Sequence, residues 1–332
     1  MRPKIAIEIG TSYTKIFKSR QDVVLLEPTL IAISKNNYKK PVAVGYEAEK
    51  LLGKVGDNIK IIRPVINTTI VDYKALCALL NAFLNKVKEK GELSPNVILT
   101  VGCGSDRKII SNFETALNKV GLYNINYAEA PVLALLGADA PLTDNSCHAV
   151  IDMGGGQTTV CALNLSGVIS GLSAEIGGNT LNQMIIKHLE EELNLTLTDS
   201  EAENLKKSVA SLVSDDDTKT VVQGKQTSSG KPRSLNVSAS QILKPVTEYA
   251  NKTAEIVNLI LSKLNSDCIK EITKNGIYLT GGGSKLYGID DYLSKALGFK
   301  TNLVKEPELS IILGAGKLIS DKELLNKLKL RS

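Results

Sequence analysis

The chain has 332 residues, long enough for two lobes that each enclose a hydrophobic core. Apolar residues make up 43% of it and charged residues 23%, as in an ordinary soluble globular protein. Its 40 basic and 35 acidic residues are spread along the chain, and it has no Trp and only four Phe. This composition carries no signature of nucleic-acid binding.

Cysteine usage and hydropathy predict a cytoplasmic protein. The five cysteines are odd in number and widely spaced, without a CxxC pair, which favours a reduced protein over a disulfide framework. The first apolar run, residues 5–9, has the length of a strand and contains Glu8, so we expect no signal peptide. No apolar run approaches the roughly 18 residues that a membrane-spanning helix needs.

The first third of the chain reads as strands followed by helices. Residues 4–17 give strand, turn and strand (KIAIEI, GTS, YTKIF), and the short strand TLIAIS follows Glu27 and Pro28. Apolar residues recur at helical spacing over 72–88. The strand NVILTVG comes next, and a second amphipathic helix is predicted from about Asp106.

The middle of the chain repeats this plan. The segment HAVIDMGGGQTTVCALN is again strand, glycine turn and strand, and a helix is predicted to begin near Asn179. The polar stretch 214–238 predicts a mobile loop or a small exposed hairpin. A long helix follows, with Pro245 expected in its first turns, where proline is tolerated. GIYLTGGGSKL then gives strand, glycine-rich turn and helix, and a last helix is predicted around 311–319.

The two strand–turn–strand units have matching polar residues. Glu8 ends a strand before Gly10, Thr11 and Ser12, just as Asp152 precedes the glycines at 154–156. Glycines let the backbone approach phosphate oxygens, and a carboxylate at the strand end can hold Mg²⁺, usually through water. One such turn is most simply structural, but two matched turns favour a nucleotide site in a cleft between duplicated halves. A third turn, residues 280–284, follows a strand and opens a helix, which adds backbone N–H donors.

These turns resemble the phosphate-1, phosphate-2 and adenosine motifs of the actin, chaperone-ATPase and sugar-kinase superfamily. Six further segments resemble the MreB-type bacterial actins in particular: LLEPTLIAI, AVGYEAEKLLGK, IIRPVINTTIVDY, GGNTLNQMI, AENLKK and LGAGKLI. The resemblance covers almost the whole chain. It implies a duplicated actin-like (ribonuclease H-like) α/β fold, with a nucleotide cleft between two lobes.

The resemblance also implies how the chain is divided and which residues form the site. Lobe I would comprise 1–136 and 308–332, with a small exposed subdomain at 31–72. Lobe II would comprise 137–307, with a small exposed subdomain at 180–240. The cofactors implied are ATP or GTP and Mg²⁺, with Glu8 and Asp152 as metal-binding and catalytic acids and Gln157 as a further catalytic residue. The implied nucleotide-binding residues are Gly10, Thr11, Ser12, Tyr13, Lys15, Gly154, Gly155, Gly156, Gln157, Gly178, Asn179, Glu203, Asn204, Leu205, Lys206, Gly281, Gly282, Gly283 and Ser284.

The departures from the family fall on its catalytic positions. Glu8 stands where the family has Asp, and Ala130 stands where a Glu positions the attacking water. Glu129 is one residue too early and is expected to point elsewhere. Because such a group contributes about 10²–10⁴-fold to a rate, we predict intact binding with slow hydrolysis. Gln157, which replaces a Thr, offers an alternative means of orienting water.

Two more departures concern nucleotide contacts. Lys15 matches the phosphate-contacting lysine of actin, which MreB proteins usually lack; a solvated strand lysine is the other interpretation. Asn179 stands where the family usually has Asp.

The function that the resemblance implies is a nucleotide-dependent cytoskeletal filament of MreB type, acting in cell shape, with copies of itself as partner. A membrane surface or a membrane-protein adaptor is a further candidate partner, for which the loop KEKGELSPN offers only Leu93. The alternatives are a plasmid-segregation filament, a non-polymerising ATP-binding sensor and a small-molecule kinase of the same fold. A kinase would need a carboxylate base over its acceptor, and the sequence offers no candidate besides Asp152.

Overall fold

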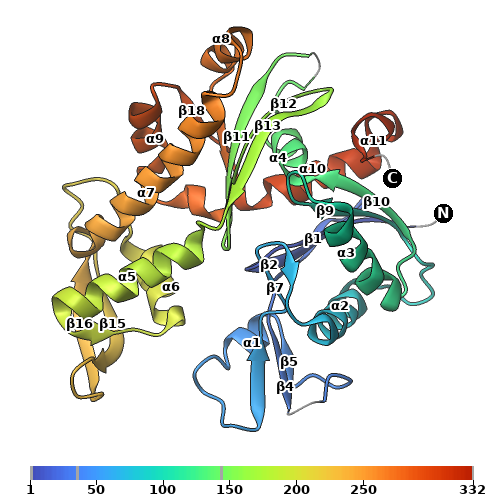
Figure 1. The fold of residues 1–332 in the computed structure, drawn as a ribbon. Helices are drawn as coiled ribbons and strands as arrows, with labels where there is room; N and C mark the ends of the chain where they lie inside the picture. Colours follow the sequence, from blue (N-terminus) through green and yellow to red (C-terminus); the bar gives the residue numbers. More distant parts are fainter. Residues whose placement is uncertain (1–2, 35–36, 143–144, 331–332) are drawn as a thin grey trace.

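The protein is described by a computed structural model that covers residues 3–34, 37–142 and 145–330. Two five-stranded sheets organise it (Figure 1). One has the order β10-β9-β1-β2-β3 and the other β13-β12-β11-β17-β18. The strands of the first sheet are β1 (Lys4–Ile9), β2 (Tyr13–Lys18), β3 (Asp22–Pro28), β9 (Asn96–Val101) and β10 (Asn124–Glu129). Those of the second are β11 (His148–Met153), β12 (Thr158–Asn164), β13 (Gly167–Ala174), β17 (Ile277–Thr280) and β18 (Thr301–Leu303).

The two sheets share one topology, which confirms the predicted duplicated α/β fold. β1 pairs antiparallel with β2 and parallel with β9, and β11 pairs antiparallel with β12 and parallel with β17. Glu8 and Asp152 occupy the penultimate positions of β1 and β11. Because equivalent strands end at equivalent edges, the duplication places both acids at the same place in their sheets.

Helices cover the sheets, and aspartates begin two of them as predicted. α2 (Tyr73–Val87) and α3 (Arg107–Lys119) pack on the first sheet, with Asp72 and Asp106 accepting N-terminal N–H groups through their side chains. The second sheet is covered by α7 (Ala239–Leu261), α8 (Ser266–Asn275) and α9 (Ile289–Leu297).

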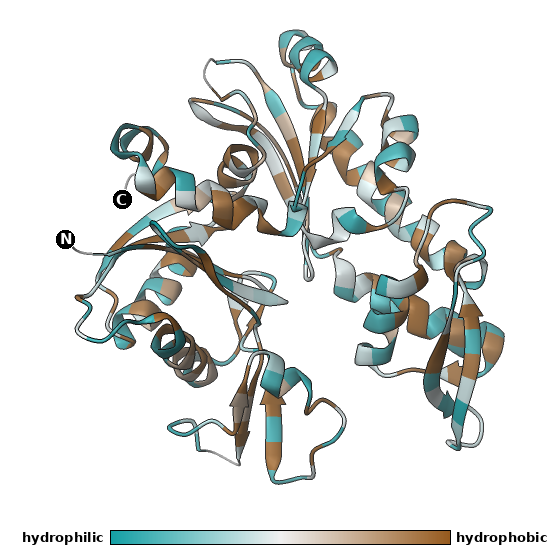
Figure 2. Ribbon diagram, turned by 180° about the vertical axis from the view of Figure 1, so that it is seen from behind, coloured by the Kyte–Doolittle hydropathy of each residue, from teal (hydrophilic) through white to brown (hydrophobic). Residues whose placement is uncertain are grey.

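Between the two sheets lie α4 (Ala130–Gly137) and α10 (Ser310–Ser320), the latter mainly hydrophobic along its length (Figure 2). They touch backbone to backbone: a Cβ on Gly314 would lie 1.9 Å from the carbonyl oxygen of Leu133. Their buried side chains form one cluster with Ala6 of β1 and Val150 of β11. The two lobes are therefore joined through a shared apolar layer. α11 (Lys322–Leu328), a short helix that we did not predict, follows α10.

Smaller elements extend from each lobe (Figure 1). On the first lobe they are β4 (Ile31–Ser34), β5 (Ala43–Val44), α1 (Tyr46–Glu49), β6 (Ile59–Ile62), β7 (Val65–Ile66) and β8 (Thr69–Ile70). On the second they are α5 (Gly178–Leu193), β14 (Leu195–Thr196), α6 (Asp199–Val209), β15 (Lys219–Gln226) and β16 (Pro232–Ser238). Of the two interpretations of 214–238, the structure shows the hairpin. No helix in the described part of the chain is long and apolar enough to cross a bilayer.

Pro245 lies in the first turns of the long helix, as predicted, but it is past the first turn. α7 begins at Ala239, so Pro245 is its seventh residue and lies inside the helix. Proline has no N–H to donate to the carbonyl four residues earlier, here Gln241. That carbonyl accepts a hydrogen bond from Nε2 of His188 on α5 instead, at 2.9 Å. A contact between helices thus compensates for the bond that the proline removes.

Replacing His188 with alanine is expected to lower the free energy of unfolding by about 1 kcal/mol, because the Gln241 carbonyl loses its partner. In a Pro245→Ala background the alanine N–H can reach this carbonyl, so the same replacement should have a smaller effect. Urea unfolding of the wild type, both single variants and the double variant measures the difference. Equal effects of His188→Ala in the two backgrounds would contradict this explanation.

Candidate nucleotide-binding cleft

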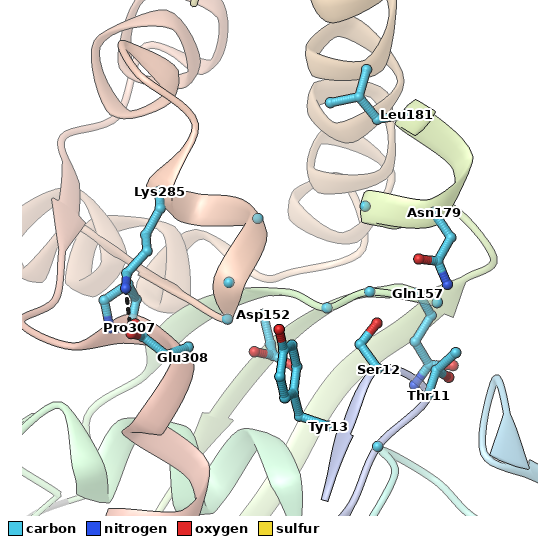
Figure 3. A pocket seen from close by; sticks show the side chains of 18 of the residues that line it. Thr11, Ser12, Tyr13, Asp152, Gln157, Asn179, Leu181, Lys285, Pro307 and Glu308 are labelled. Carbon is cyan, nitrogen blue, oxygen red and sulfur yellow. Dashed lines mark hydrogen bonds and ion pairs between the residues drawn. The ribbon is translucent and has the colours of Figure 1, made fainter. Parts of the chain in front are cut away.

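A cavity of about 1050 Å³ opens between the two lobes, where the three glycine turns meet (Figure 3). Its lining includes most of the residues nominated from the sequence: Glu8, Gly10, Thr11, Ser12, Tyr13, Lys15, Ala130, Asp152, Gly154, Gly155, Gly156, Gln157, Gly178, Asn179, Glu203, Lys206, Gly281, Gly282 and Gly283. Residues from every third of the chain are thus brought together in one place.

Three nominated residues lie outside this lining. Leu205 is fully buried in the core of the second lobe, and Asn204 is exposed on another face of α6. Helical periodicity explains this, because Glu203, Lys206 and Lys207 share the face toward the cavity. Ser284 is buried, and its hydroxyl donates to the carbonyl of Gly281 at 2.7 Å. Ser284 therefore stabilises the third turn from the protein interior and does not face the cavity.

The two hairpin turns have the same internal hydrogen bond and face each other. Gly10 N donates to Tyr13 O at 3.0 Å, and Gly154 N donates to Gln157 O at 2.9 Å. A Cβ on Gly155 would lie 1.9 Å from Ser12 Oγ. This close approach requires glycine, and it leaves backbone N–H groups at the cavity surface, where they suit phosphate oxygens.

The segment 63–68, which contains β7 and the turn after it, supports the first hairpin. Arg63 Nη1 donates to Thr11 O at 2.6 Å, and Asn67 N donates to Thr11 Oγ1 at 2.9 Å. Asn67 and Thr68 both have positive φ, 46° and 62°, and Thr68 lines the cavity. Both residues belong to the segment IIRPVINTTIVDY, which resembles the family, but neither was predicted to be part of the site. Two hydrogen bonds from this segment therefore fix Thr11 of the first hairpin.

Glu8 and Lys15 form a cross-strand ion pair at the base of the cavity. Lys15 Nζ lies 2.6 Å from Glu8 Oε1, and the two side chains are only 10% and 13% exposed. The alternative of a solvated strand lysine is therefore wrong. The other oxygen, Glu8 Oε2, is buried and has no hydrogen-bond partner among the described residues. The pair presents an unused acceptor together with a positive charge beside the phosphate-binding turns.

Asp152 lies beside this pair, half-buried in the cavity lining. Burial and, to a smaller extent, the charge of Glu8 raise the pKa of Asp152 to about 6, although Lys15 and a 3.1 Å hydrogen bond from Thr280 Oγ1 act in the opposite direction. Two neighbouring carboxylates repel each other, and the single charge of Lys15 offsets this repulsion only in part.

This environment fits Mg²⁺. The ion prefers oxygen ligands and usually takes one or two carboxylates, with phosphate oxygens and water completing its shell. Glu8 Oε2 and Asp152 would supply the protein's share, directly or through water. In the described residues no group of three or more His, Cys, Asp or Glu could hold a metal alone, so phosphates and water would have to complete the site.

Asp152 should make the nucleotide-free protein less stable as the pH rises. The carboxyl titrates near 3.9 in an unfolded chain, so between about pH 4 and pH 6 the folded state binds the extra proton. The free energy of unfolding should fall by about 3 kcal/mol across this interval from this group alone. Chemical unfolding of the wild type and Asp152→Asn at several pH values checks this. The same pH slope in both proteins would contradict it.

Opposite the hairpins, α6 contributes a charged cluster. Burial opposes ionisation of Glu203, but Lys206, a hydrogen bond from Asn182 and Lys207 outweigh it and lower its pKa to about 2. Lys206 Nζ also donates to Gly178 O at 3.0 Å, which ties α6 to the start of α5. Glu203 is therefore ionised at neutral pH.

The structure shows where the residues that depart from the family's catalytic pattern lie. Ala130 and Gln157 both line the cavity. Glu129 Oε1 accepts a hydrogen bond from Gly104 N at 2.9 Å, so this carboxylate is directed to the loop after β9. Glu129 therefore does not replace the carboxylate that Ala130 lacks.

Further lining residues were missed from the sequence, among them Lys207, Tyr249, Lys285 and Glu308. Lys207 shares a helix face with two nominated residues, which could have identified it. Lys285 and Glu308 belong to two short 3₁₀ helices that are distant in sequence, and no spacing rule connects them. Tyr249 lies in the middle of a helix with ordinary core periodicity.

Comparison with known proteins agrees with this architecture. The family model described as MreB/Mbl protein matches residues 2–327. The cell shape-determining protein MreB of Escherichia coli (strain K12) is 27% identical over 321 residues, which cover 95% of this chain and 92% of that protein. The cell shape-determining protein Mbl of Bacillus subtilis (strain 168) is 26% identical over 328 residues, 98% of each chain.

Solved structures show the same fold. MreB5 of Spiroplasma citri bound to ADP superposes with a TM-score of 0.92 at 25% identity over 98% of each chain. A MamK double helical filament gives a TM-score of 0.78 at 18% identity, covering 97% of this chain and 99% of its own. With a family model that spans almost its entire length, this chain belongs to the MreB/Mbl family.

Proposed function

We propose that this protein binds ATP with Mg²⁺ in the cleft and assembles into filaments of its own copies that act in cell shape. The observation that carries the proposal is the meeting of two identically bonded glycine turns across one cavity, with Glu8 and Asp152 beside them. The relatives give independent support. Two are described as cell shape-determining, MreB5 was solved with AMPPNP and with ADP, and MamK forms a double helical filament.

The arrangement suggests how nucleotide would act on assembly. The phosphate-binding turns belong to different sheets, so a triphosphate held by both would fix one relative orientation of the lobes. Lys15 would offset part of the phosphate charge, and Mg²⁺ at Glu8 and Asp152 would neutralise more of it when bound. A lobe orientation stabilised by ATP can favour the subunit contacts of a filament, because ligand binding shifts the population toward the form that binds it better.

Hydrolysis in this proposal is slow. A water-positioning carboxylate is missing at Ala130, and Glu129 is engaged elsewhere. Gln157 lies in the lining and is the remaining side chain suited to orient a water. Filaments would therefore persist in the ATP-bound form.

We also propose the division into lobes given above, 1–136 with 308–332 and 137–307. The two lobes meet at α4 and α10, which pack against both sheets.

Any contact with a membrane would require many subunits acting together. Leu93 is 63% exposed, and one fully buried leucine contributes only about 1.5–3 kcal/mol. Only many subunits in a filament would make such a contact stable.

The test follows sedimentation and phosphate release in the same samples. Purified protein with Mg²⁺ and ATP should pellet while releasing little phosphate, and it should stay soluble without nucleotide. GTP in parallel samples measures nucleotide preference. Absence of pelleting across a range of salt and Mg²⁺ concentrations would contradict the filament, and ATP turnover that depends on an added sugar would favour the kinase.

A further inference from the structure

An ion pair occupies one end of the cavity, away from the hairpin turns. Lys285 ends the short helix η1 (Gly282–Lys285), and Glu308 lies in η2 (Pro307–Leu309). Lys285 Nζ contacts Glu308 Oε1, as the dashed line in Figure 3 shows, and both residues line the cavity. Glu308 Oε2 is buried and has no hydrogen-bond partner among the described residues. A buried acceptor without a donor is unfavourable, so this oxygen suits a ligand that brings one.

The charges here do not suit a phosphate. The pair is neutral as a whole, and the free oxygen belongs to a carboxylate, which would repel a phosphate group. Donors suited to phosphate are the backbone N–H groups of the hairpins. In the view of Figure 3, Lys285 and Glu308 lie on one side of Asp152, and Thr11 and Gln157 lie on the other. A nucleotide with its phosphates on the hairpins would therefore extend its other end toward this pair.

The surroundings suit a flat ring. Gly282 lines the cavity, and a Cβ built on it would meet no atom within 4 Å, so bare backbone faces open space there. The geometry is also fixed, because Gly281 N donates to Pro307 O at 2.8 Å and thereby ties the third turn to η2. A planar base lying against Gly282 would place a polar edge within reach of Glu308.

We propose that Glu308, oriented by Lys285, is a specificity-determining residue that accepts a hydrogen bond from the 6-amino group of adenine. This inference rests on the proposed function, since it requires a purine nucleotide in the cleft. A 6-oxo purine, such as hypoxanthine or guanine, would place an acceptor opposite the carboxylate. Glu308 would then remain unpaired and be repelled, so the site rejects such bases.

The experiment compares the affinities of the wild type and Glu308→Gln for the Mg²⁺ complexes of ATP and ITP. ITP carries a 6-oxo group in place of the 6-amino group of ATP, and its N1 carries a proton. The wild type should bind ATP roughly 10–100-fold more tightly than ITP. The glutamine amide can donate to a 6-oxo group, so the ATP-to-ITP preference of Glu308→Gln should fall by at least roughly tenfold. Purine riboside triphosphate has only hydrogen at carbon 6. Its affinity should therefore be similar for the wild type and for Glu308→Gln.

Glu306→Gln is the matched control. It makes the same chemical change two residues earlier, on an exposed side chain outside the cavity lining, and should keep the wild-type preference. If the ATP-to-ITP preference of Glu308→Gln stays within about twofold of the wild-type value, with both nucleotides bound normally, Glu308 does not determine specificity. This result would leave the proposed function unaffected. Failure of the wild type to bind either nucleotide would overturn the proposed function as well.

Discussion

Replacing Ala130 with glutamate is expected to raise the rate of phosphate release from ATP about a hundredfold. Ala130 is the first residue of α4 and lines the cavity, so a longer side chain at this position can extend toward the bound phosphates. A carboxylate in the first turn of a helix is also favourable for the helix dipole, and we expect the variant to fold. Single-turnover phosphate release measures the effect.

The control for this gain is Ala130→Gln, which has nearly the same size and no carboxylate. It should raise the rate much less than Ala130→Glu does, because an amide can orient a water but cannot take up its proton. Equal rates for Ala130→Glu and the wild type would show that this position does not limit hydrolysis. A loss of the acquired activity on combining Ala130→Glu with Gln157→Ala would indicate that Gln157 helps to orient the water.

Adding one methyl group at Gly156 is expected to weaken ATP binding by up to about 3 kcal/mol, roughly 100-fold. A Cβ at this position would lie 2.3 Å from Asn67 Oδ1 and 2.6 Å from Thr11 Oγ1. Gly156 belongs to the second lobe and the other two residues to the first, so Gly156→Ala would push the phosphate-binding turns apart. Fluorescent-nucleotide titration gives the affinity, and sedimentation shows whether assembly is lost with it.

Gly56→Ala is the matched control for this substitution. A Cβ at Gly56 meets no atom within 4 Å, so the same change there should leave affinity and assembly at their wild-type values. Wild-type affinity in Gly156→Ala would contradict the placement of the phosphates between the two turns.

Sequence reasoning succeeded where a local pattern determines a local structure. The turns after Glu8 and Asp152 and the helix starts at Asp72 and Asp106 each follow from a few adjacent residues. The duplicated topology could be predicted because the same pattern recurs. The missing carboxylate at Ala130 could also be predicted, because it depends only on the identity of one residue.

The remainder depends on contacts between distant segments. Pro245 is accommodated inside α7 because His188 of another helix bonds to the carbonyl that it leaves free. Similarly, Asn67 reaches Thr11 only after the small subdomain has folded onto the first hairpin. The pairing of Lys285 with Glu308 depends on how the third turn meets the start of α10. No periodicity or spacing in the sequence predicts these contacts.

The most direct test of the central claim is the stoichiometry and metal dependence of ATP binding, measured by equilibrium dialysis of the monomer. The account predicts one ATP per chain, bound tightly with Mg²⁺ and much more weakly in EDTA or in Gly156→Ala. ATP binding that is absent, or that is unchanged by both EDTA and Gly156→Ala, would contradict a nucleotide held between the two hairpins.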